Sequence, residues 1–205
     1  MNNNFSLLQR YNKWRLKNNN FTVFSNDCWG AEVYHYYDLA YNTPFIGLYL
    51  MAPCYIKFLM DPQYYFSQKL EFSYHSKYES VENLRSKREE NFPTACIQDI
   101  EIQFLHYKDE KEALEKWNRR KERINYNNLF VKFDGSKDES NDELIRIFDN
   151  LPYKNKICIC NRKIENIKSL VYCPDWQKDG SLMFAQSIKY FRLTDWLNGK
   201  GLKLK

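Results

Sequence analysis

The stretch that decides the fold is Phe21-Thr22-Val23-Phe24-Ser25-Asn26-Asp27-Cys28-Trp29-Gly30. A short β-prone run leads into small polar residues, and an amphipathic helical pattern begins directly afterwards. In α/β proteins such a junction commonly binds ligands, because the helix N-terminus offers unpaired N–H groups to an anion. We therefore expect a strand near residues 21–25, a helix over about 30–39 and a ligand site between them.

The same strand–helix pattern recurs along the chain. The run at residues 44–50 is continuously apolar, which is typical of a strand buried on both faces. Asp109 and Glu112 form a capping-box pattern at the start of a further helix. At least four repeats with short connections predict an α/β fold whose sheet is mostly parallel, with helices on both faces. The other expected strands are 70–74, 99–106, 129–133 and 156–160, and the other expected helices are 6–17, 53–60, 142–150 and 181–191, with 78–90 an exposed helix or loop and Trp196 in a turn.

Length and composition favour one soluble domain. We expect residues 1–205 to form a single α/β domain, with an N-terminal extension over about 1–20 and a flexible tail over about 197–205. Hydrophobic residues make up 43% and aromatic residues 17%, which excludes global disorder. The formal charge of +5 is spread among interleaved charges of both signs, so it does not predict nucleic-acid binding.

The chain shows neither a secretory signal nor a transmembrane segment, and we expect it to be cytoplasmic with reduced thiols. Cys158 and Cys160 would share one face of a strand, where core packing is favoured over metal binding. The lysine-rich residues 200–205 allow peripheral contact with an anionic membrane, with a solvated tail as the alternative.

Polar residues follow several of the expected strands. Because the carboxyl ends of parallel strands meet along one edge, we expect them to gather into one site. The alternative is that the Asp and Ser residues only cap the helices that follow. His106 is the preferred acid or base, although a purely structural histidine is equally compatible with the sequence. The strand-end residues are Ser25, Asn26, Asp27, Ala52, His106, Tyr107, Asp134, Gly135, Ser136, Asn161 and Arg162.

A pair of carboxylates and a cysteine are further candidate functional residues. Asp99 and Glu101 would share one strand face, so this face must reach water, a basic partner or a ligand, unless the strand is antiparallel or at an edge. Cys28 at a helix start is a less favoured nucleophile, because it requires His106 to lie nearby as a base.

Several known site types are excluded by their missing motifs. The chain has no G-x-G-x-x-G dinucleotide loop, no P-loop, no G-x-S-x-G elbow and no H-E-x-x-H. It also lacks the Asp-x-Asp triplet that holds a metal ion in many glycosyltransferases. The sequence therefore predicts no metal site and leaves the cofactor unknown.

Four motifs resemble a bacterial family of unknown function. They are Ser-Asn-Asp-Cys-Trp-Gly-Ala (25–31), Tyr-Asn-Thr-Pro-Phe-Ile-Gly-Leu (41–48), Asp-Ile-Glu-Ile-Gln-Phe-Leu-His-Tyr (99–107) and Trp-Asn-Arg-Arg-Lys-Glu-Arg-Ile-Asn (117–125). The family is usually labelled exopolysaccharide biosynthesis protein and is found in capsule and surface-polysaccharide loci. The resemblance implies a three-layer, Rossmann-like α/β fold and a role in surface-glycan assembly.

The leading hypothesis is a glycosyltransferase-like enzyme with a nucleotide-sugar donor. The diphosphate would lie against Ser25, Asn26, Cys28 and Gly30 at the helix start, with Arg119, Arg120 or Lys132 neutralising its charge. Trp29 and Tyr34 would stack on sugar or base, Glu101 and Tyr107 would contact the ligand, and His106, Asp134 or Asp27 would be catalytic. The alternatives are a non-catalytic binding or regulatory partner of polysaccharide machinery, and an acyl or other group transferase acting on a glycan.

Overall fold

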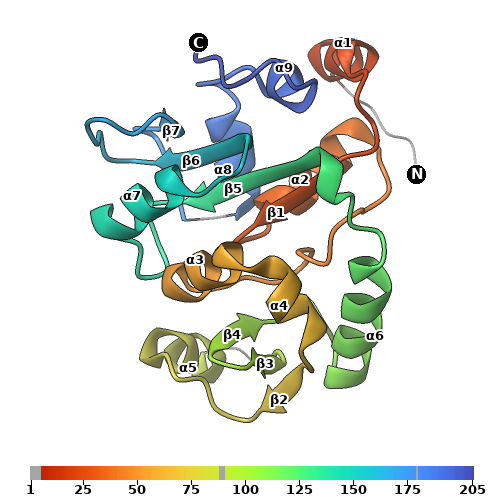
Figure 1. Ribbon diagram of the computed structural model, residues 1–205, viewed down its shortest axis with the longest axis vertical. Coiled ribbons are helices and arrows are strands. Elements are labelled where there is room, and N and C mark those ends of the chain that lie inside the picture. The colour runs from red at the N-terminus through yellow and green to blue at the C-terminus, as the bar shows by residue number, and fades with distance from the viewer. Residues whose placement is uncertain (1–5, 88–90, 179) are drawn as a thin grey trace.

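The protein contains two β-sheets, which lie in different parts of the molecule (Figure 1). The computed structural model describes residues 6–87, 91–178 and 180–205. The larger sheet is parallel, with the strand order β1-β5-β6-β7, and the smaller sheet is antiparallel, with the order β2-β3-β4. The strands are β1 (Thr22–Ser25), β2 (Glu71–Ser73), β3 (Thr94–Ile97), β4 (Ile100–Gln103), β5 (Leu129–Asp134), β6 (Asn155–Cys160) and β7 (Leu170–Tyr172).

Most of the helices connect these strands, and several begin at a residue whose side chain caps the helix. Asp109 caps its helix by accepting a hydrogen bond from the Glu112 amide at 2.8 Å, which confirms the predicted cap. Asn141 caps the helix after β5 in the same way, at 2.9 Å from the Leu144 amide. The helices are α1 (Leu7–Arg15), α2 (Trp29–Tyr37), α3 (Ala52–Met60), α4 (Pro62–Ser67), α5 (Glu79–Ser86), α6 (Glu110–Lys121), η1 (Tyr126–Asn128), α7 (Asp142–Asn150), α8 (Gly180–Ser187) and α9 (Leu193–Leu197).

Both faces of the parallel sheet are buried, because alternate side chains of its strands join two different hydrophobic clusters. Ile157 and Ile159 of β6 pack with residues of α2, α8 and α9. Cys158 and Cys160 pack on the other face with residues of α3 and α7, which confirms that this cysteine pair is part of the core. The prediction of an α/β fold with a parallel sheet is therefore confirmed, and the more specific three-layer, Rossmann-like arrangement stays a prediction.

The prediction of a strand at residues 44–50 is wrong. This segment is buried, but its only sheet-like pairing is an isolated bridge between Tyr49 and Gln103. Gly47 has a positive φ of 71°, which turns the chain out of an extended path. A continuous apolar run indicates burial, and here the segment is buried as an irregular connection between the two sheets.

The strand expected at residues 99–106 exists as β4, but it is antiparallel. Gln98, with a φ of 56°, makes the tight turn between β3 and β4, and the sequence pattern did not predict β3. β7 was also missed, and Trp196 lies in the short helix α9 rather than in a turn. The parallel sheet accordingly has four strands, and the segment from β2 to β4 forms a separate antiparallel layer.

Aromatic side chains join the two sheets. Trp117 of α6 has its ring centroid 5.5 Å from that of Phe66, 6.1 Å from that of Phe45 and 6.2 Å from that of Phe104. Phe45 in turn lies 5.0 Å from Phe24 of β1. This cluster fixes the antiparallel layer against the parallel sheet, and so it also fixes the space between them.

Candidate functional site

A buried charge cluster lies at the carboxyl end of the parallel sheet. The register of β1 and β5 pairs Ser25 with Lys132, which brings the residues after β1 beside the end of β5. Lys132 Nζ lies 2.7 Å from Asp27 Oδ2 and 3.7 Å from Asp134 Oδ2, and all three side chains are buried. Lys137 adds a second ammonium group 3.2 Å from Asp27 Oδ2. The predicted gathering of strand-end residues is therefore observed for Asp27 and Asp134.

The two carboxyl groups of this cluster respond differently to burial. Burial alone would raise the pKa of Asp27, but the charges of Lys132 and Lys137 outweigh it and hold this pKa well below its usual range. Burial raises the pKa of Asp134, and the neighbouring Asp27 charge adds to the effect. Asp27 is therefore ionised at neutral pH.

The start of α2 differs from the expected anion site. Asp27 Oδ1 accepts hydrogen bonds from the Trp29 amide at 3.1 Å and from Ser25 Oγ at 2.9 Å. Asn26 Oδ1 accepts a hydrogen bond from the Asp134 amide at 2.8 Å and links β1 to β5. A carboxylate of the protein thus already takes the helix-start amide on which the diphosphate was expected.

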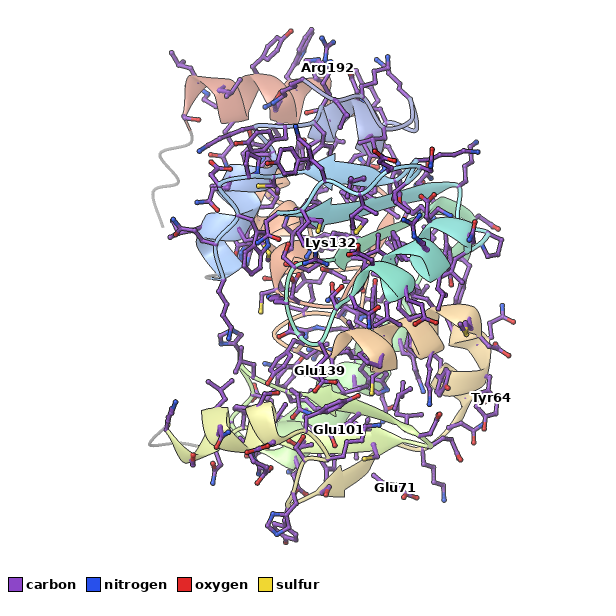
Figure 2. The ribbon with its side chains drawn as sticks, turned by 90° about the vertical axis from the view of Figure 1, so that its left-hand side faces the viewer. Tyr64, Glu71, Glu101, Lys132, Glu139 and Arg192 are labelled. Atoms are coloured by element: carbon purple, nitrogen blue, oxygen red, sulfur yellow. The ribbon has the colours of Figure 1, made fainter. Side chains whose placement is uncertain are left out.

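A cavity of about 580 Å³ opens beside this cluster. We call it the Asp27–Asp138 cavity. It lies between the carboxyl end of the parallel sheet and helix α5, and Figure 2 shows Glu139 between Lys132 of the parallel sheet and Glu101 of the antiparallel sheet. One part of the wall is charged and another is apolar. The lining residues are Asp27, Cys28, Glu32, Tyr49, Met51, Ser80, Val81, Leu84, Leu105, His106, Lys137, Asp138 and Lys178.

Asp138 is an acid group of the cavity whose pKa is raised rather than lowered. Burial raises its pKa to about 6, with Lys137 acting against the rise and Asp134 and Asp27 adding to it. Its backbone oxygen accepts a hydrogen bond from the Ala52 amide at 2.7 Å, which holds the loop after β5 against α3. A carboxyl group with a pKa near neutrality can both accept and donate a proton under physiological conditions.

Cys28 also lines the cavity, but as a thiol. Burial, together with the charges of Asp27 and Glu32, raises its pKa to about 11. The thiolate form required of a nucleophile is therefore scarce at neutral pH.

Asp138→Asn is expected to stabilise the protein at high pH and to change little at low pH. The Asp138 carboxyl has a pKa of about 6 in the folded protein, against an ordinary value of 3.8. The contribution of its protonated form to the free energy of unfolding is therefore complete below pH 3.8 and is lost as the pH rises through 6. Asn carries no charge at any pH and tolerates the φ of 55° at this position. Urea denaturation should show a gain on the order of 2 kcal/mol at about pH 8 and almost none below about pH 4.

The matched control is Asp142→Asn, which removes an exposed carboxylate at the start of α7. Its effect on stability should not follow the same pH profile. An Asp138→Asn protein with the same denaturation midpoint as the parent at high pH would contradict the assigned burial of this carboxyl.

Comparison with known proteins identifies the family. Residues 2–198 match the family described as a domain of unknown function, DUF1919. The chain belongs to the DUF1919 family. A relative from Haemophilus influenzae (strain ATCC 51907 / DSM 11121 / KW20 / Rd), described as an uncharacterized protein, is 31% identical over 186 residues, which is 91% of this chain and 81% of the relative. These matches show the family without assigning an activity.

In this DUF1919 chain, three of the sequence motifs are hydrogen-bonded into one framework around His106. Arg120 Nη1 donates to Tyr107 Oη at 2.7 Å, and Tyr107 Oη donates to the Ile46 carbonyl at 2.6 Å. The Gly47 carbonyl accepts from the His106 amide at 2.9 Å, and a Cβ on Gly47 would come within 3.3 Å of His106 Cβ. The motifs at 41–48, 99–107 and 117–125 thus place His106 at the cavity, where the motif at 25–31 contributes Asp27 and Cys28.

The aromatic residues expected to stack on a ligand are core residues instead. Trp29 is fully buried against Phe184, Phe191 and Trp196, and its indole N–H donates to Ser187 Oγ at 2.8 Å. The Tyr34 hydroxyl is also buried and donates to the Phe21 carbonyl at 3.2 Å. Neither side chain lines the Asp27–Asp138 cavity, because Trp29 faces α8 and α9 and Tyr34 faces β1.

Glu101 and the α6 arginines have structural partners away from the cavity. Glu101 is buried in β4 and accepts hydrogen bonds from Ser76 Oγ, the Lys77 amide and Gln103 Nε2. Arg120 is buried against Tyr107, and Arg119 is exposed on α6. Glu101 lies on an antiparallel strand, which is one of the expected alternatives, whereas Asp99 lies in the turn before β4 and has a basic partner, Lys57.

Gly30 and Asp134 do not line the cavity but pack behind its wall. A Cβ on Gly30 would lie 3.1 Å from Ser25 Cβ, so glycine permits the close approach of α2 to β1. Asp134 is fully buried, and its Oδ2 accepts a hydrogen bond from Trp176 Nε1 at 3.1 Å. Asp134 therefore lies behind the cavity wall.

The charged cavity residues that sequence reasoning missed are Glu32, Lys137, Asp138 and Lys178. Lys137 and Asp138 had a signal, because both closely follow the polar end of β5. Among residues 6–87, 91–178 and 180–205, no group of three His, Cys, Asp or Glu side chains is arranged to hold a metal ion. Within the same residues, no helix is long and apolar enough to cross a membrane.

Proposed function

We propose that the protein is an enzyme of exopolysaccharide or capsule assembly, a glycosyltransferase that takes a nucleotide-sugar donor in the Asp27–Asp138 cavity. The observation that carries the proposal is the composition of the cavity wall. It combines ammonium groups, a carboxyl group with a pKa near neutrality, a histidine and an apolar surface. Its position beside the carboxyl ends of β1 and β5 is where ligands bind in parallel α/β sheets.

The charged wall supports binding of a diphosphate. Lys137 and Lys178 are both cavity residues, and Lys137 is held by Asp27 and Asp138. Ammonium groups form strong charge-assisted hydrogen bonds with phosphate oxygens. These two lysines replace Arg119 and Arg120 in the role expected from the sequence.

The apolar wall supports binding of a nucleobase or sugar ring. Tyr49, Met51, Val81, Leu84 and Leu105 contribute this surface from the connection after α2, from α5 and from the chain after β4. Ligand cavities usually combine such a surface with a few polar groups that orient the ligand.

The transfer step requires a base. Asp138 or His106 would take the proton of an acceptor hydroxyl, whose oxygen attacks the anomeric carbon of the donor sugar. The bond from that carbon to the diphosphate oxygen breaks, and the nucleoside diphosphate leaves with the electron pair. Lys137 and Lys178 would stabilise the negative charge that develops on the leaving oxygen. The motifs at 25–31, 41–48, 99–107 and 117–125, which resemble an exopolysaccharide biosynthesis family, support a glycan as the acceptor.

Isothermal titration with a panel of nucleotide sugars, with and without a divalent metal ion, tests the proposal. At least one donor should bind, and Lys178→Ala should weaken that binding by about tenfold because one charged hydrogen bond to phosphate is lost. Lys163→Ala, in the loop after β6, removes a lysine that does not line the cavity and is the matched control. Binding by no nucleotide sugar would contradict the proposal.

Turnover separates the enzyme from a non-catalytic partner. His106 is exposed, so His106→Ala should fold normally. Because Asp138 and His106 are the two candidate bases, an enzyme should lose glycan production in the double variant His106→Ala with Asp138→Asn, whereas a non-catalytic partner of polysaccharide machinery should retain it.

A further inference from the structure

Helix α1 attaches to the body of the protein through its polar side. Gln9 Nε2 donates to the Tyr36 carbonyl at 3.0 Å, and Asn12 Nδ2 donates to Tyr36 Oη at 2.9 Å. Arg15 forms an ion pair with Asp195 of α9 at 2.7 Å. These three residues are spaced three apart along the helix and therefore lie on one side of it.

The opposite side of α1 is apolar and faces outward. Leu7 is 83% exposed, Tyr11 53% and Trp14 70%, and Leu8, which is 66% exposed, lies at the edge of this side next to Asn12 and Arg15. Residues at positions i, i+4 and i+7 form one helical stripe, and in a water-soluble protein such a stripe normally faces the core. Here the amphipathic arrangement is inverted, because polar residues bind the protein and large apolar residues point away from it.

Helix α1 lies beside the last segment of the chain, and both segments carry several Lys and Arg residues. The Arg192 amide donates to the Lys203 carbonyl at 2.8 Å, and the Lys205 amide donates to the Tyr190 carbonyl at 2.9 Å, so this segment is held in place. Figure 1 shows α1, α9 and the C-terminal end together at the end of the molecule remote from β2, β3 and β4. Residues 6–17 and 188–205 contain nine Lys and Arg residues and a single acidic residue, Asp195.

The single acidic residue does not offset this charge at the surface. Asp195 is buried and is paired with both Arg15 and Lys200. Two further acidic residues reach this end of the molecule, because Lys13 pairs with Asp38 and Lys189 with Asp175, and the remaining Lys and Arg residues leave it net positive. A second copy of the chain would present the same positive face and would be repelled.

The aromatic residues of the stripe are suited to a lipid–water interface. The rings of Tyr11 and Trp14 are stacked with 6.1 Å between their centroids, and Lys17 Nζ lies 5.3 Å from the Trp14 centroid. Tyr and Trp concentrate at headgroup level in membrane proteins, and nearby lysines extend their ammonium groups to the phosphates.

We propose that α1 and residues 188–205 form a surface that binds the headgroup region of an anionic lipid bilayer. Leu7, Leu8, Tyr11 and Trp14 insert at the acyl boundary, with α1 parallel to the membrane plane. Lys17, Lys200 and Lys203 contact the negatively charged headgroups. Apolar insertion and basic attraction are the two components that anchor interfacial helices. This attachment is independent of the chemistry proposed for the cavity.

Co-sedimentation with lipid vesicles tests this surface. The full chain should bind vesicles of phosphatidylcholine mixed with phosphatidylglycerol and should bind pure phosphatidylcholine vesicles much more weakly. The double variant Leu7→Ser with Trp14→Ser should bind the mixed vesicles at least about tenfold more weakly. The double variant Lys200→Glu with Lys203→Glu should lose the preference for the anionic lipid.

The matched control is Tyr74→Ser with Tyr126→Ser, which removes exposed aromatic area elsewhere on the surface. Circular dichroism should show that all the variants fold, because the replaced residues are exposed. Absence of binding to the mixed vesicles, or equal loss in the Tyr74/Tyr126 control, would overturn the proposal. Self-association that the Leu7/Trp14 variant abolishes, without vesicle binding, would assign the surface to a second copy instead.

Discussion

Replacing Lys132 with methionine is expected to lower the free energy of unfolding by about 3–5 kcal/mol. Lys132 is fully buried between Asp27 and Asp134, and its ammonium group lies 2.7 Å from the Asp27 carboxylate. Methionine has a similar length but no charge. The substitution would leave the Asp27 carboxylate buried beside Asp134 with Lys137 as its remaining cation, and an undercompensated buried charge is strongly destabilising.

Urea denaturation of the two proteins measures this loss. Lys57→Met is the matched control, because Lys57 pairs with Asp99 at the same 2.7 Å but both side chains are more than half exposed. Water and salt screen such a pair, so its loss should change stability little. The double variant Lys132→Met with Asp27→Asn should recover part of the stability, because it removes the buried charge as well as its partner. Equal stability of Lys132→Met and Lys57→Met would contradict the role assigned to the cluster.

Trp117→Ala is also expected to lower the free energy of unfolding by about 3–5 kcal/mol. The Trp117 side chain is 1% exposed and contacts the rings of Phe45, Phe66 and Phe104. Alanine would leave a large cavity where the antiparallel layer meets the parallel sheet. The surrounding rings cannot fill this cavity without moving the two layers relative to each other.

Thermal and urea denaturation followed by circular dichroism test this effect. Trp14→Ala removes the same side chain from the outward face of α1, where it is 70% exposed, and should leave the stability nearly unchanged. Trp117→Phe should have a smaller effect than Trp117→Ala, because part of the ring contact remains. A Trp117→Ala protein as stable as Trp14→Ala would show that the aromatic cluster does not hold the layers together.

Sequence patterns predicted the elements whose signals are local. The strand before Asp134, the helix after Asn141 and the cap at Asp109 lie where capping residues and apolar periodicity indicate. A strand was wrongly predicted at residues 44–50, and strand β3 was not predicted. Burial of the first segment reflects contacts with both sheets. Strand β3 pairs with β2, which lies well before it in the chain, and with β4, which follows it directly across the turn at Gln98. The contacts of the first segment and the pairing with β2 lie outside a short window of sequence, whereas the β3–β4 hairpin is local and was missed.

The candidate site was predicted in part for a similar reason. Asp27, Cys28 and His106 were expected from their positions at strand ends, and all three line the Asp27–Asp138 cavity. Trp29 was grouped with them because it is adjacent in sequence, yet its helical position turns its ring into the core. Position along the chain places a residue at a site, but the rotation of the helix decides which way its side chain points.

The amino-acid order alone established an α/β protein, a parallel sheet and a polar junction at Ser25–Gly30. These follow from hydrophobic periodicity, capping and turn residues, which act between neighbours in the chain. Tertiary packing decided that Lys132 pairs with Asp27, that Lys137, Asp138 and Lys178 complete the cavity, and that α1 exposes its apolar side. These depend on distances between segments far apart in sequence, because ion pairing, desolvation and close packing are set by separation in space.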